Sequence, residues 1–166
     1  MFDLKPLSRE SIPRALEKAE RYRLLDEPVQ AESICQDVLR IEPDNQHALV
    51  MLLLAITDQF DEGLADRVSE ARRVLPRLRD EYERLYYAGI ICERLARAQL
   101  KRGGPGSGFR AHEGLREAMS FYEKAEALRP PGNDDSLLRW NTCARILARN
   151  PRLAPGPEER VEPPLE

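Results

Sequence analysis

Residues 31–43 read AESICQDVLRIEP, residues 64–76 read LADRVSEARRVLP, and residues 118–130 read AMSFYEKAEALRP. Each stretch has an apolar residue at its first and fifth positions and ends in proline. Side chains four residues apart lie on one face of a helix, and proline cannot continue a helix, so each stretch predicts an amphipathic helix that ends by its proline. Self-similarity of this kind is typical of a repeat protein. The sequence therefore predicts an all-α fold.

Further helices are predicted between and around these three stretches. Ser11 and Pro13 are residue types that favour a helix start, and an apolar periodicity follows them. The stretch from residue 46 to 59 is apolar on nearly every side and includes Leu52 and Leu53, which predicts a helix buried all round at the centre of the stack. Residues 102–108, rich in glycine, are predicted to be non-helical. The predicted helices cover residues 12–25, 29–42, 46–59, 64–75, 80–101, 109–128 and 134–150.

The first helix pair, residues 12–45, resembles a tetratricopeptide repeat. That family has a period of 34 residues with a small residue, a tyrosine, an alanine and a proline at fixed positions. Ala19, Tyr22, Ala31 and Pro43 stand at those positions in this chain. In the later repeats, Pro76 follows Pro43 by 33 residues, close to one period.

The resemblance is weaker at the bulky positions. Ala15, Lys18 and Cys35 stand where the family has a large aromatic residue, leucine and phenylalanine. The resemblance implies a right-handed superhelix of three helix pairs closed by a capping helix. The expected organisation is an N-terminal extension (1–10), a repeat domain (11–150, with repeats at 12–45, 46–78 and 79–132 and a capping helix at 134–150) and a proline-rich, disordered tail (151–166).

Composition argues against several classes of function. Lys and Arg total 26 against 29 Asp and Glu, and the net charge is −3, whereas a nucleic-acid protein needs a basic face. Only four of the basic residues are lysine, a bias typical of G+C-rich bacterial genomes. The first residues show no basic region followed by a long apolar run, so we expect no secretion. The longest apolar run is far shorter than the roughly 20 residues that span a bilayer. We expect a cytoplasmic protein that binds neither nucleic acid nor membrane.

No catalytic, metal or cofactor motif is recognised in the sequence. Three cysteines, Cys35, Cys92 and Cys143, lack the CxxC spacing of zinc or redox sites and are predicted to be reduced core thiols. His47 and His112 have no metal-ligand spacing and are predicted to lie at the surface or at helix caps. We therefore expect no metal, no cofactor and no enzymatic activity.

Two other features have a predominantly structural interpretation. The loop 103–108 is predicted to be a flexible connector, with a partner-contacting loop or an anion-binding nest as alternatives. Glutamates stand three or four residues before arginines, a spacing that predicts solvent-exposed ion pairs. Those pairs are Glu70 with Arg73, Glu93 with Arg97, and Glu113 with Arg116.

The resemblance also implies a binding surface, because the first helix of each tetratricopeptide repeat lines a concave groove. Tyr and Arg dominate binding hot spots, and Tyr87, Arg94 and Arg145 are the leading candidates. Trp140 is predicted to pack the last helix onto the third repeat. Carried over by register, the groove candidates are Glu20, Arg23, His47, Val50, Leu54, Thr57, Tyr86, Tyr87, Glu93, Arg94, Asn141 and Arg145.

The function predicted on this basis is a protein–protein adaptor that holds a peptide segment or a partner protein in the groove. A secretion-type chaperone remains an alternative within the same class. A small-ligand protein or enzyme on a helical scaffold is an alternative from another class, and it requires a polar cluster in a concave pocket. An RNA-reading helical repeat is a further alternative, and it requires a basic concave stripe formed by Arg23, Arg94 and Arg145.

Overall fold

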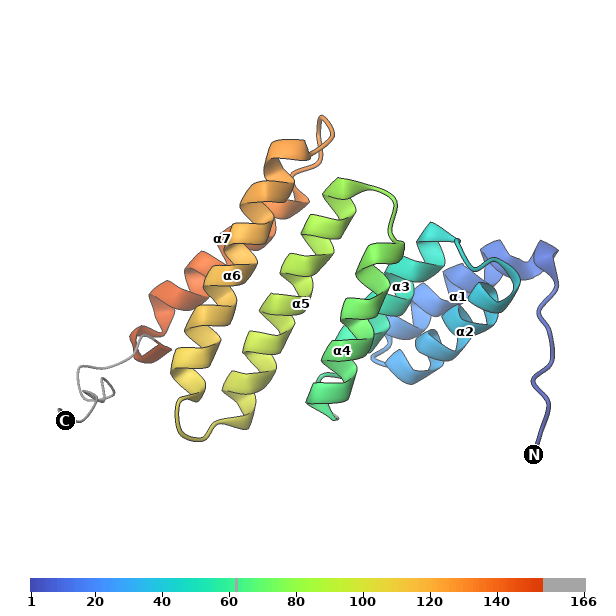
Figure 1. The fold of residues 1–166 in the computed structure, drawn as a ribbon, viewed down its shortest axis with the longest axis horizontal. Helices are drawn as coiled ribbons and strands as arrows, with labels where there is room; N and C mark the ends of the chain where they lie inside the picture. The colour runs from blue at the N-terminus through green and yellow to red at the C-terminus, as the bar shows by residue number, and fades with distance from the viewer. Residues whose placement is uncertain (62, 154–166) are drawn as a thin grey trace, which may run out of the picture. The chain divides into compact units, whose positions relative to one another are not determined.

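The computed structural model of the chain describes residues 1–61 and 63–153 (Figure 1). Within these residues the chain forms seven α-helices, three short 3-10 helices and no β-strand, so the all-α prediction is confirmed. No helix in these ranges is long and apolar enough to cross a membrane. The chain divides into two compact units, which we call unit 1 (Met1–Asp80) and unit 2 (Glu81–Glu166).

Unit 1 is a stack of four helices. Consecutive helices pack on one another, and α1 also contacts α3. The predicted helix ranges agree with the structure to within one or two residues at most ends. The helices are α1 (Ile12–Leu24), α2 (Pro28–Ile41), α3 (Gln46–Thr57) and α4 (Leu64–Val74), with the short helices η1 (Arg9–Ser11) and η2 (Leu75–Arg77) at the two ends.

Local chemistry explains where the helices of unit 1 begin. Pro28 stands at the first position of α2, where its missing N–H would be unpaired anyway. The side chain of Asn45 caps α3 by accepting a hydrogen bond from the Ala48 N–H at 2.9 Å. Ser11 precedes α1 as predicted, but its hydroxyl donates to the Ser8 carbonyl oxygen instead of capping the helix.

The α3 helix forms the core of unit 1. Leu49 and Leu53 are fully buried, and Leu52 is 8% exposed. Val50 and Leu54 are half-buried, and among the residues of this helix only His47, in its first turn, is exposed. The prediction of a helix buried on nearly all sides is therefore confirmed.

Unit 2 contains three helices: α5 (Glu81–Arg102), α6 (Ser107–Leu128) and α7 (Asp135–Arg149), followed by the short helix η3 (Pro151–Leu153). The α5 and α6 helices run antiparallel and pack along most of their length, and α7 packs on α6 (Figure 1). Gly89 lets α5 approach α6 closely, because a Cβ atom there would lie 2.5 Å from Cε1 of Tyr122. Gly89 is therefore at a close crossing of the two helices.

Two predicted boundaries are wrong in unit 2. The non-helical connection covers only residues 103–106, since α5 includes Arg102 and α6 begins at Ser107. Residues 151–153 are not part of an extended tail: they form η3, which packs on α6, and Leu153 is 3% exposed. The remainder of the predicted tail, residues 154–166, lies outside the described residues.

Candidate functional site

A buried carboxylate organises unit 2. Glu93 on α5 is fully enclosed. Its Oε2 accepts a hydrogen bond of 2.7 Å from the Tyr122 hydroxyl on α6, and its Oε1 accepts bonds from Arg139 on α7 at 3.3 Å and from Arg97 at 3.4 Å. A buried charge is tolerated only when it is paired and hydrogen-bonded, and Glu93 meets both conditions. The carboxylate therefore ties the three helices of unit 2 together.

Tyrosine rings surround this carboxylate on one side. The Tyr86 ring stacks on Tyr82 at a centroid distance of 5.9 Å and meets Tyr87 edge-on at 5.1 Å. It also lies 5.9 Å from the Tyr122 ring. Burial raises the pKa of all four phenols above the ordinary value of tyrosine, so they are protonated at neutral pH. The Tyr122 hydroxyl donates to Glu93, and the Tyr82 hydroxyl donates to Asn133 at 3.4 Å.

A cleft lies next to Tyr86 of this cluster, between α5 and α7. We call it the α5–α7 cleft. Its volume is about 300 Å³, and it is lined by Tyr86 from α5 and by Asp135, Leu138, Arg139 and Thr142 from α7. Leu138 is 59% exposed, so the cleft offers an aliphatic contact beside a phenol and a guanidinium. This combination of groups can contact an amphipathic side chain.

The Arg139 guanidinium fixes the polar end of the cleft. It contacts the Glu93 carboxylate and donates to the Tyr86 hydroxyl. Burial is the largest single influence and would lower the pKa of Arg139, but the Glu93 charge, the hydrogen bond to Tyr86 and the nearby phenols together outweigh it, so the pKa is raised. The guanidinium is therefore held in place by the interior of unit 2 while a third of the side chain remains exposed.

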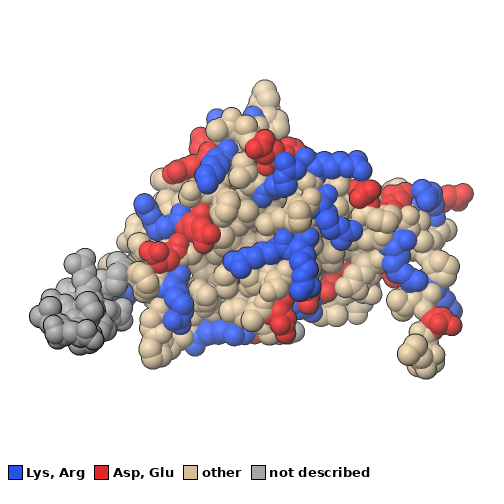
Figure 2. Space-filling view, viewed as in Figure 1, with Lys and Arg blue, Asp and Glu red and all other residues tan. Residues whose placement is uncertain are grey.

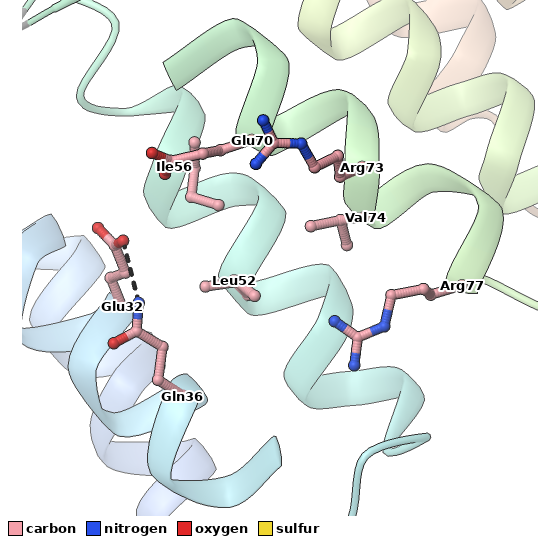
Figure 3. Close-up of a pocket in the computed structure, with 8 residues that line it drawn as sticks. All are labelled: Glu32, Gln36, Leu52, Ile56, Glu70, Arg73, Val74 and Arg77. Atoms are coloured by element: carbon pink, nitrogen blue, oxygen red, sulfur yellow. Dashed lines mark hydrogen bonds between the residues drawn. The ribbon is translucent and has the colours of Figure 1, made fainter. Parts of the chain in front are cut away.

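Unit 1 has a groove of its own on a different set of helices. We call it the α2–α4 groove. Its volume is about 280 Å³ (Figure 3). The lining residues are Glu32 and Gln36 from α2, Leu52 and Ile56 from α3, Glu70, Arg73 and Val74 from α4, and Arg77 from η2.

The predicted groove residues of unit 1 differ in how accessible their side chains are to a partner. The hydroxyl of Thr57 donates to the Leu54 carbonyl oxygen and its side chain is almost fully buried, so it offers no surface to a partner. Arg23 forms an ion pair of 2.7 Å with Asp58 that connects α1 to the end of α3. Of the other predicted residues of this unit, Glu20 and His47 are exposed and Val50 and Leu54 are half-buried.

The predicted groove residues of unit 2 lie partly in the α5–α7 cleft. Tyr86 lines it, and Tyr87 is half-buried against Tyr86. Glu93 is fully buried, so the prediction of a solvent-exposed Glu93–Arg97 pair is wrong for the glutamate. The remaining predicted residues of this unit are Arg94 and Asn141, both half-buried, and Arg145, which is exposed.

Sequence reasoning missed the α7 side of the cleft. Asp135, Leu138, Arg139 and Thr142 are spaced three and four residues apart, a signal that places them on one helix face. Sequence reasoning singled out Trp140 on this helix instead. Its Nε1 donates to Glu123 on α6 at 2.9 Å, so it attaches the last helix to α6 outside the cleft.

Figure 2 shows basic and acidic side chains interspersed over the face in view, without a continuous basic stripe. Within residues 1–61 and 63–153, no group of three metal-ligating side chains occurs. The thiols of Cys35, Cys92 and Cys143 are free and buried.

Comparison of the chain with protein-family models, with curated proteins and with solved structures gives no significant match.

Proposed function

We propose that this chain is a protein-binding adaptor of the tetratricopeptide type, which holds a peptide segment of a partner protein against the first helices of its repeats. In this proposal α1, α3, α5 and α7 are the first helices and line the concave side of a right-handed superhelix, and α2, α4 and α6 are the second helices. Three buried, reduced thiols fit a protein of the reducing cytoplasm.

The packing within each unit supports this assignment. In unit 1, α1 contacts α3 directly, as the first helices of consecutive repeats do in a stacked array. In unit 2, the α5–α7 cleft lies between two helices that the assignment makes first helices.

The observation that carries the proposal is the α5–α7 cleft. Its lining combines Tyr86, Arg139 and the exposed Leu138, and aromatic and arginine side chains dominate binding hot spots. A volume of about 300 Å³ is at the lower end of small-molecule sites, and it suits one or two side chains of a peptide better than a cofactor.

The test begins with affinity capture of the partner from native cells and continues with titration of the purified partner. Leu138→Arg places a charge in the cleft and is expected to weaken binding at least about tenfold. Leu128→Arg is the matched control, because Leu128 is a similarly exposed leucine on α6 that does not line the cleft. Failure to retain any partner, or equal affinities of the two variants, contradicts the proposal.

A further inference from the structure

We propose that the α2–α4 groove of unit 1 is a second docking site, which holds an acidic, aliphatic segment of a partner protein. This site goes beyond the proposed function, because it lies on helices that the adaptor assignment makes second helices, together with one side of α3. The argument rests on the shape of the groove, on its floor and on the balance of its charges.

The floor of the groove is apolar. Leu52 and Ile56 stand one helical turn apart on α3, and Val74 meets them from α4. Figure 3 shows these three side chains between the polar residues of α2 and the arginines of α4 and η2. An apolar cavity of about 150 Å³ holds a benzene ring, so about 280 Å³ has room for one or two aliphatic side chains.

The acidic side of the groove already has its counter-ion. Nη1 of Arg67 donates to Glu32 at 2.9 Å and to Glu70 at 3.0 Å. The amide of Gln59 also donates to Glu32, at 2.6 Å. Both carboxylates are therefore bound within unit 1, and a basic ligand would have to displace Arg67 to reach them.

The basic side of the groove has no counter-ion. The sequence predicts a Glu70–Arg73 ion pair, but Glu70 pairs with Arg67 instead. Within the described residues the Arg73 side chain forms no ion pair and no hydrogen bond. The Arg77 guanidinium donates only to the neutral Pro43 carbonyl oxygen, at 2.9 Å. Three guanidiniums thus meet two carboxylates around this groove, and the excess charge is positive.

The excess positive charge favours an acidic segment as the ligand of the groove. A carboxylate of the partner protein supplies the negative counter-charge that Arg73 and Arg77 lack. The planar guanidinium of arginine binds a carboxylate with directional hydrogen bonds. An aliphatic side chain beside that carboxylate covers the floor of Leu52, Ile56 and Val74. A partner segment with leucines and glutamates one helical turn apart presents both groups together.

The test uses short, fluorescein-labelled peptides and the full-length protein. The first peptide carries two leucines and two glutamates one helical turn apart, the second has lysine in place of glutamate, and the third has serine in place of leucine. Fluorescence anisotropy is expected to show saturable binding of the first peptide and affinities at least about tenfold lower for the other two. Added salt should weaken binding of the first peptide, because part of the attraction is between charges.

Two neighbouring arginines provide the variants. Arg73→Glu is expected to lower the affinity for the glutamate peptide at least about tenfold and to raise that for the lysine peptide. Arg72→Glu is the matched control: Arg72 is exposed on the same turn of α4 and does not line the groove, so binding should change less than about twofold. Circular dichroism verifies that both variants keep their helical content.

Several results would overturn this site. Absence of saturable binding of the glutamate peptide is one, and equal losses in Arg73→Glu and Arg72→Glu is another. Binding that survives Arg73→Glu but is lost in Leu138→Arg would move the peptide to the α5–α7 cleft, which refutes the second site and leaves the proposed function standing. A dimer in sedimentation that Arg73→Glu dissociates would show that the groove takes a second copy of the chain instead.

Discussion

Replacing Glu93 by alanine is expected to lower the free energy of unfolding of unit 2 by about 3–5 kcal/mol, as removal of one partner from a buried ion pair does. The largest part comes from the Tyr122 hydroxyl. It donates to Glu93 at 2.7 Å, both residues are fully buried, and a buried hydroxyl without an acceptor costs about 1–3 kcal/mol. A further part comes from the cavity that the missing side chain leaves.

The two arginines contribute less. The Arg97 side chain is 55% exposed and Arg139 is 33% exposed, so both guanidiniums can turn to water when the carboxylate is gone. Glu93→Gln keeps an acceptor for Tyr122 and the shape of the side chain, and it is expected to cost about 1–3 kcal/mol. Glu93→Ala is therefore expected to lower the free energy of unfolding more than Glu93→Gln does.

Urea unfolding of the full chain measures this, followed by the fluorescence of Trp140, which is the only tryptophan and lies in unit 2. Glu117→Ala, at an exposed glutamate of α6, is the control and should stay within about 0.5 kcal/mol of the wild type. The reasoning fails if Glu93→Ala also stays within that range, or if Arg97→Ala costs as much as Glu93→Ala.

Three further perturbations have defined outcomes. Gly89→Ala should destabilise unit 2 by about 1–3 kcal/mol in the same urea assay, because its Cβ would overlap the Tyr122 ring, and an unchanged midpoint would contradict the close crossing. Leu153→Ala should lower the melting temperature measured by circular dichroism, because this side chain is buried; an unaltered melt would mean that η3 adds nothing to stability. Burial raises the pKa of Cys35 and Cys143 from 9.0 to about 12, so their contribution to stability is complete below about pH 9 and is lost as the pH rises toward about 12; a midpoint urea concentration that stays constant from about pH 9 to about pH 12 would refute this.

The helices of unit 1 were predictable because their signals are local. Apolar residues at helical spacing and prolines such as Pro43 mark the elements, and the run around Leu53 marks the core. These signals depend only on residues within one or two helical turns. The start of α6 at Ser107 was missed because glycine-rich sequence favours a loop, whereas here Gly106, at φ 72°, ends the loop and the helix starts directly after it.

The buried contacts of unit 2 could not be predicted from such local signals. Glu93 and Arg97 have the spacing of an exposed pair, but the residues that enclose the carboxylate are distant in sequence. Tyr122 is 29 residues and Arg139 is 46 residues further along the chain. Which residues meet across three packed helices depends on how the helices are aligned where they cross, and a single sequence does not define that alignment.

Amide chemical-shift mapping by NMR, with the captured partner segment added to the full-length protein, tests the adaptor proposal most directly. Since binding to a surface changes the environment of the amides beneath it, the proposal predicts that the largest changes fall on Tyr86, Leu138 and Thr142 around the α5–α7 cleft. Changes confined to the outer face of α6, around Glu117 and Lys124, or the absence of any change at saturating partner, would contradict it.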